Sequence, residues 1–114
     1  MNILIILNDA PYGSERSYNG LRLAKALGDE ETQVTLFLLS DAVACAKQEQ
    51  KVPAGFYNLE RMLKSVLRRG EVLACGMCMD ARGLRLEEMV PGVERSSMDE
   101  LAKRTRAADR VLVF

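Results

Sequence analysis

Two thiols and one arginine offer the most direct chemistry in this sequence. Cys75 and Cys78 form a C-x-x-C motif, and Arg82 lies four residues after Cys78. The chain of 114 residues contains no histidine. It therefore cannot by itself assemble a Ser-His-Asp or Cys-His nucleophilic site, a histidine metal site or an imidazole proton shuttle. Its chemistry has to come from thiols, carboxylates, lysine, arginine or tyrosine.

Four interpretations of the C-x-x-C motif compete. A thioredoxin-like redox pair opens a helix whose dipole lowers a thiol pKa, whereas Gly76 and Gly83 here bracket a stretch that indicates a loop. A structural zinc site needs four ligands and the chain has only three cysteines, so we expect neither a metal nor another cofactor. Cys75 could be a small buried residue that ends a strand. The fourth interpretation is a single nucleophilic thiol.

The nucleophilic interpretation depends on groups that stabilise an anion. Arg82 can place a positive charge near a thiolate, the loop glycines allow the backbone to approach closely, and amides at a strand-to-helix turn can bind an anion. The alternatives are a solvated arginine or a surface ion pair at Arg82, and a simple turn residue at Asp80. Cys45 falls in an alanine-rich stretch and is expected to pack in the core.

Apolar periodicity predicts strands that alternate with helices. Strands are expected over residues 2–7, 32–39, 71–75, 93–96 and 110–114. Helices are expected from an N-cap at Ser14 to Gly28, over 42–47 with Asp41 as cap, over 58–69, and after the S-x-x-E capping box that begins at Ser97. This alternation predicts an α/β fold with a mostly parallel, five-stranded sheet and helices on both faces.

In open α/β sheets, ligands bind outside the carboxyl ends of the strands. The segments that leave those ends here are residues 8–14, 40–41 and 75–83, which we expect to meet at one edge. The first of them precedes a helix N-terminus and would suit an anion. No G-x-G-x-x-G fingerprint or Walker phosphate loop is present. The ligand-binding candidates are Asn8, Tyr12, Gly13, Ser14, Asp41 and Gly83.

Composition limits the class of protein. The length and the 48% of hydrophobic residues suit one domain, over residues 1–114. Sixteen basic and sixteen acidic residues leave no net charge, so nucleic acid and anionic lipid are not expected partners. The amino terminus shows neither a secretory signal nor a membrane helix, and an odd number of cysteines favours reduced thiols. We therefore expect a soluble, cytoplasmic protein.

Four blocks in this order resemble the DsrE/DsrF-like family, most closely its YchN-like branch. They are residues 10–15 (APYGSE), 38–43 (LLSDAV), 75–83 (CGMCMDARG) and 108–114 (ADRVLVF). The resemblance implies a three-layer Rossmann-like fold, assembly into homotrimers or homohexamers, and an association with sulfur metabolism. In TusD-type sulfur-relay relatives, a cysteine before the Arg-Gly pair accepts sulfur as a persulfide and passes it to another carrier protein. Counted back from Arg82 and Gly83, the matching residue is Cys75.

The first hypothesis is thus a cysteine-based sulfur carrier or transferase that works through Cys75, Cys78 and Arg82. Cys78 is an addition of the YchN-like branch and could resolve a persulfide on Cys75 into a disulfide, with release of sulfide. The second hypothesis is a non-enzymatic, oligomeric module that binds a ligand or a partner. The third is a dithiol redox protein with a reversible Cys75–Cys78 disulfide.

Overall fold

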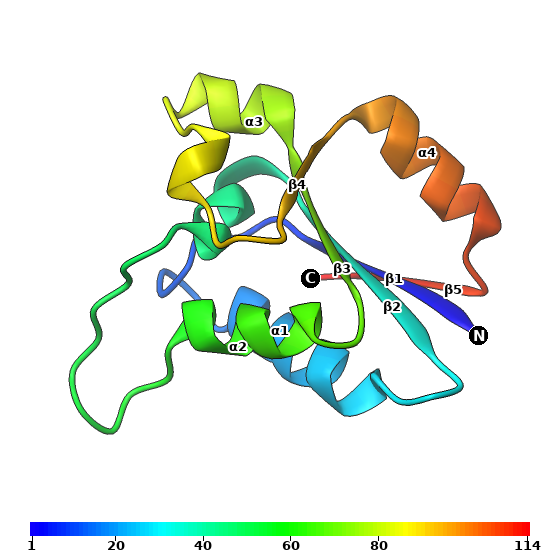
Figure 1. The fold of residues 1–114 in the computed structure, drawn as a ribbon, viewed down its shortest axis with the longest axis horizontal. Helices are drawn as coiled ribbons and strands as arrows, with labels where there is room; N and C mark the ends of the chain where they lie inside the picture. The colour runs from blue at the N-terminus through cyan, green and yellow to red at the C-terminus, as the bar shows by residue number, and fades with distance from the viewer.

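Five parallel strands form the sheet at the centre of the protein (Figure 1). The computed structural model describes residues 1–114. The strands are β1 (Asn2–Leu7), β2 (Gln33–Leu38), β3 (Glu71–Cys75), β4 (Glu94–Ser96) and β5 (Arg110–Val113). Their order is β4-β3-β2-β1-β5, and every pairing is parallel, so the predicted "mostly parallel" sheet is parallel throughout.

The three middle strands are apolar along nearly their whole length because both of their faces are covered. Ile5 of β1 lies opposite Leu36 of β2, which lies opposite Val72 of β3. All three side chains are buried. The uninterrupted apolar runs in the sequence are therefore the mark of strands enclosed on both sides.

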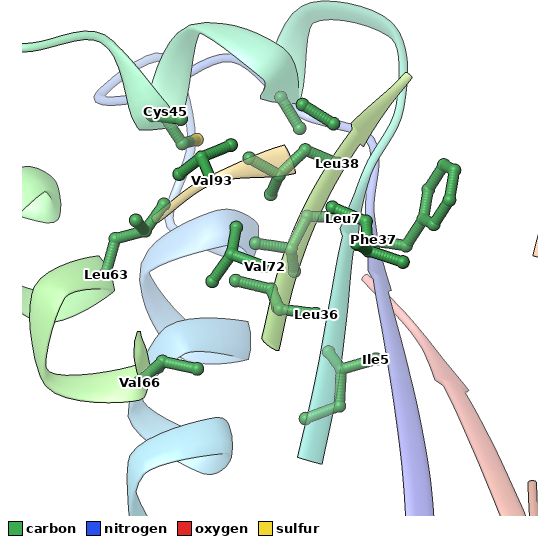
Figure 2. Close-up of a cluster of buried hydrophobic side chains, with 14 of the residues drawn as sticks. Ile5, Leu7, Leu36, Phe37, Leu38, Cys45, Leu63, Val66, Val72 and Val93 are labelled. Carbon is green, nitrogen blue, oxygen red and sulfur yellow. The ribbon is translucent and has the colours of Figure 1, made fainter. Parts of the chain in front are cut away.

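Helices α1 (Arg16–Leu27) and α2 (Leu59–Leu67) cover one face of the sheet, together with the 3₁₀ helix η1 (Ser40–Ala46). The helix predicted over 58–69 is confirmed with slightly shorter bounds. It begins where the Asn58 side chain accepts a hydrogen bond from the Arg61 N–H at 3.1 Å. Figure 2 shows Leu63 and Val66 of α2 directed toward Val72 of the sheet.

Helix α4 (Met98–Ala107) lies on the opposite face, so the prediction of helices on both faces is confirmed (Figure 1). The Ser97 hydroxyl accepts the Glu100 N–H at 3.2 Å, as the S-x-x-E pattern predicts. Arg104 anchors the far end of α4 on the sheet because its guanidinium bonds to Glu71 at the start of β3 and to Thr35 of β2. The carboxyl ends of the strands are left free for other segments.

The stretch from Gly76 to Gly83, predicted as a loop, is mostly a helix. Helix α3 (Gly76–Ala81) starts directly after β3, and the short 3₁₀ helix η2 (Leu86–Glu88) follows. A glycine disfavours a helix in its interior, but Gly76 occupies the first turn, and the buried Met79 holds α3 against the core. Gly83 has φ +65°, the left-handed conformation that commonly ends a helix. The loop prediction was wrong because tertiary packing outweighed local propensity.

Two predicted helix caps were also wrong. The N-cap of α1 is Glu15, because the Ser14 hydroxyl donates to the Asp9 carboxylate at 2.6 Å and the helix begins one residue later. The N-cap of η1 is Leu39, and Asp41 lies in the first turn with its carboxylate paired to Arg82. At η1 the Asp41 carboxylate binds Arg82 instead of a helix amide, whereas Ser14 still accepts the Arg16 N–H at 3.3 Å from the position before the N-cap.

None of the helices has the length and apolar character that crossing a membrane requires.

Candidate functional site

Cys75 stands at the junction between the sheet and α3. It is the last residue of β3 and the N-cap residue of α3, and only 6% of its surface is exposed. Its position in the parallel ladder is opposite Ser96 of β4. The sequence therefore placed Cys75 correctly at the carboxyl end of a strand, but it did not predict helix α3, which follows Cys75 directly.

Cys78 lies in the first turn of α3 and is partly exposed. Its sulfur accepts a hydrogen bond from the Ser40 N–H at 3.2 Å. Burial raises the pKa of the Cys78 thiol, and its hydrogen bond with Cys75 raises it further, while the Ser40 amide and the Arg82 charge act in the opposite direction. Both cysteines are free, and the neighbouring Cys75 thiol helps to keep the proton on Cys78.

Arg82 ends α3 and ties it to η1. Its Nε–H and Nη2 atoms lie 2.9 Å from the Asp41 carboxylate, and Nη1 donates to the Cys78 carbonyl at 2.9 Å. Nη2 also lies 3.4 Å from the Ser40 hydroxyl. The structure therefore combines the two interpretations of Arg82. It is an ion-pair residue whose charge also favours the thiolate of Cys78.

Ser40 is a part of the site that sequence reasoning missed. Its φ of +52° places it in the left-handed region, which turns its amide toward the Cys78 sulfur. Nothing in a serine between a strand and a helix signals this role. The LLSDAV block marked the segment, but only the fold shows that its backbone contacts a thiol.

Arg95 of β4 was also missed. It forms a two-point ion pair with Asp80 of α3, with Nη1···Oδ1 2.9 Å and Nη2···Oδ2 2.8 Å. The guanidinium lies against Gly76, where an added Cβ would stand 2.5 Å from Cζ. Arg95 holds the pKa of Asp80 below its ordinary value. Asp80 is therefore a helix residue with an ion-pair partner, and the turn interpretation was wrong.

The candidates from the first loop bond elsewhere. The Tyr12 hydroxyl donates to Gln50 and accepts the Leu59 N–H at 3.0 Å, while Asn8 donates to the Phe114 carbonyl. The Ser14 hydroxyl donates to the Asp9 carboxylate. A Cβ added at Gly13 would lie nearest to the Cβ of Ala10, within the same loop. Asp41 and Gly83, in contrast, belong to the segments around α3. Of the ligand-binding candidates, the structure joins only these two to the cysteine pair.

Cys45 packs in the core, as expected. It is fully buried in η1, and Figure 2 shows it pointing into the cluster of apolar side chains toward Val93. Burial raises the pKa of the Cys45 thiol to about 12. Its thiolate is therefore scarce at neutral pH, and Cys45 has no place in the chemistry of the pair.

Cys45 should give the folded protein a specific pH dependence. In the unfolded chain a thiol ionises near pH ~8.5, so between that pH and about 12 the unfolded state loses its proton first. Stability is then expected to fall as the pH rises through this window. We expect a steeper loss of unfolding free energy from pH 8 to 10 in the native sequence than in Cys45→Ala, as measured by urea denaturation. Equal slopes would contradict the assignment.

Taken together, the fold and this site define a parallel α/β protein that carries two neighbouring free thiols at the carboxyl edge of its sheet. The family model for the DsrE/DsrF-like family matches residues 1–114. The chain is 43% identical to protein YchN of Escherichia coli K12, over 98% of this chain and 97% of that protein. It is 36% identical to an uncharacterised protein of Methanocaldococcus jannaschii, over the whole of both chains. The chain belongs to the DsrE/DsrF-like family.

Solved structures agree with this assignment. The crystal structure of YchN from Escherichia coli superimposes with a TM-score of 0.93 at 42% identity and covers 100% of this chain and 99% of that one. A protein of unknown function from Methanobacterium thermoautotrophicum matches with a TM-score of 0.74 at 14% identity, over 96% and 95% of the two chains. The second likeness concerns the fold alone.

Proposed function

We propose that this protein is a cysteine-based sulfur carrier or transferase and that Cys75 accepts sulfane sulfur as a persulfide. One observation carries the proposal: Cys75 ends β3 and Cys78 lies in the first turn of α3, so two free thiols stand at the edge of the sheet where α/β proteins bind their ligands. Membership of the DsrE/DsrF-like family supports a role in sulfur metabolism.

The proposed transfer needs no cofactor. The Cys75 thiolate attacks the outer sulfur of a donor persulfide R–S–SH, an S–S bond forms to Cys75, and the donor S–S bond breaks to leave the thiolate R–S⁻. The product is a persulfide on Cys75. An acceptor thiolate, for example on another sulfur-carrier protein, can then attack that outer sulfur and restore the Cys75 thiolate.

Cys78 has two proposed roles. As a protonated thiol in contact with Cys75, it can donate a hydrogen bond to the Cys75 sulfur. As a nucleophile it can attack the inner sulfur of the Cys75 persulfide, which forms a Cys75–Cys78 disulfide and releases HS⁻. Arg82 and the Ser40 amide would stabilise the Cys78 thiolate that this second step requires.

Intact-mass spectrometry tests the proposal. The reduced protein is incubated with a small-molecule persulfide, and the donor is then removed. We expect a mass increase of one sulfur atom that disappears on treatment with a thiol reductant, and peptide mapping should place it on Cys75. Absence of added sulfur over a range of donor concentrations, in both the native protein and Cys78→Ser, which lacks the thiol that can release HS⁻, would overturn the proposal.

A second candidate is a dithiol redox protein, favoured by the contact between the thiols and by the position of Cys78 in the first turn of α3. It requires a Cys75–Cys78 disulfide that forms without any sulfane sulfur. Oxidation by glutathione disulfide, followed by trapping of free thiols, distinguishes the two. A reversible disulfide in a protein that takes up no sulfur from the persulfide would favour the redox function.

We also propose that copies of this chain assemble. Val111 and Val113 of the edge strand β5 are exposed, and an apolar edge strand is a surface that proteins usually cover. Light scattering coupled to size exclusion would test assembly, and a monomer at micromolar concentration would contradict it.

A further inference from the structure

Strand β4 brings a positive charge next to Cys75. The Arg95 guanidinium lies against Gly76, the residue that follows Cys75, with Cζ 2.5 Å and Nε 2.6 Å from the position of an added Cβ. Only glycine leaves room for this approach. The guanidinium therefore lies across the backbone that joins β3 to α3.

Asp80 orients this guanidinium without using all of its donors. Its two carboxylate oxygens bind Nη1 and Nη2, which fixes the plane of the group in a two-point pair. The Nε–H takes no part in that pair. Asp80 is the first cause of the raised pKa of Arg95, and the negative charge of an ionised Cys75 contributes in the same direction. The charge of Arg95 is thus held in place one residue from Cys75.

Ser96 supplies a second polar group on the same strand. It is the register partner of Cys75, so both side chains point to the same face of the sheet. Arg95 is opposite Ala74 and points to the other face, from which its charge acts across the backbone at Gly76. The Ser96 Oγ is buried and has no hydrogen-bond partner. Buried hydroxyls nearly always have a partner, so this one calls for an explanation. A persulfide would extend the Cys75 side chain by a bond of about 2 Å and bring a sulfur acceptor nearer to it.

We propose that β4 stabilises the anionic sulfur on Cys75, with Arg95 supplying the charge and Ser96 the hydrogen bond, while Arg82 serves Cys78. This inference rests on the proposed sulfur transfer and assigns the two arginines to different thiols. The Arg82 guanidinium donates to the Cys78 carbonyl and to Asp41 on the η1 side. The Arg95 guanidinium lies at Gly76 on the β4 side. Each cation is held by one aspartate that fixes its position.

Alkylation kinetics test the assignment without any sulfur donor. In a Cys78→Ser background, modification of Cys75 by iodoacetamide is followed by peptide mass spectrometry from pH 6 to 9. We expect Arg95→Gln to slow the reaction at pH 7 by about threefold to tenfold and to move the rate profile to higher pH, as loss of a nearby cation does. Arg95→Lys should retain part of the rate. Ser96→Ala should leave this rate unchanged, because its hydroxyl has no partner before sulfur is added, and should instead shorten the lifetime of the Cys75 persulfide in the same background.

Matched variants exclude a general effect of charge removal. Arg85→Gln removes an exposed arginine of the neighbouring segment that pairs with Glu87 and Glu88, and it should leave the profile unchanged. Should Arg95→Gln fail to fold, Gly76→Ala displaces the guanidinium while keeping its charge, and the rate should fall in the same direction.

The outcomes separate this inference from the proposed function. An unchanged profile in folded Arg95→Gln, or an equal shift in Arg85→Gln, would overturn the role of β4 even if Cys75 takes up sulfur. Failure of both the native protein and Cys78→Ser to take up sulfur would overturn the proposed function even if Arg95 governs the reactivity of Cys75.

Discussion

Replacing Cys75 with serine is expected to abolish sulfur uptake. A serine hydroxyl is not ionised near neutral pH and cannot form the S–S bond of a persulfide, so we expect a loss of at least about a hundredfold in the sulfur-loaded fraction. Intact-mass spectrometry after incubation with the persulfide donor measures it. The nearly isosteric change at a buried position should leave the thermal unfolding transition close to that of the native protein.

Cys78→Ser is the matched control for this experiment. It removes the neighbouring thiol but leaves Cys75, so the added sulfur should remain and should persist longer, because the step that releases HS⁻ requires the Cys78 thiolate. A serine at this position can still accept the Ser40 N–H. If the serine variant of Cys75 still takes up all the sulfur and that of Cys78 takes up none, the two roles are reversed.

The second large effect concerns stability. Phe37 of β2 has 0% of its surface exposed, and Phe37→Ala is expected to lower the free energy of unfolding by about 3–5 kcal/mol. The physical reason is the lost burial of a large apolar side chain together with the cavity that remains. Urea denaturation followed by circular dichroism measures the change. The same strand leads into Ser40, so loss of order here should also loosen the amide that contacts Cys78.

Phe56 provides the control, because the same side chain is 69% exposed there. Phe56→Ala should change the free energy of unfolding by no more than about 0.5 kcal/mol. A comparable loss in both variants would show that the effect of Phe37→Ala does not come from core packing. It would also contradict the buried position of β2 in the sheet.

The strands were the most predictable part of the fold. Residues 2–7 and 71–75 match β1 and β3 to the residue, because a continuous apolar run bounded by polar residues needs no distant information. The amphipathic pattern over 58–69 likewise predicted α2. The short strand predicted over 93–96 is also confirmed as β4, whereas the loop predicted at α3 and the cap predicted at η1 were wrong. Helix α3 and the first turn of η1 are held by Met79 and by the Asp41–Arg82 pair, and such contacts are not visible in a local window.

The candidate site was predictable in part for the same reason. Cys75 follows a recognisable strand, so its place at the carboxyl edge could be derived from the chain itself. Arg95 could not, because β4 is only three residues long and its place beside β3 depends on strand order. For Tyr12, the local sequence pattern predicted a role that differs from the contact the side chain makes. Its turn suggested a ligand loop, but its hydroxyl fastens the start of α2 through Leu59.

The sequence by itself determined that any reactive thiol here is activated without imidazole, and that Cys75 ends a buried strand. Residue types and local apolar patterns suffice for both conclusions. Only the tertiary structure decided that Cys78 lies in a helix, that the Ser40 amide faces its sulfur, and that Arg95 lies against Gly76. The last two pairings join residues far apart in the chain, and their proximity arises from the sheet order β4-β3-β2-β1-β5.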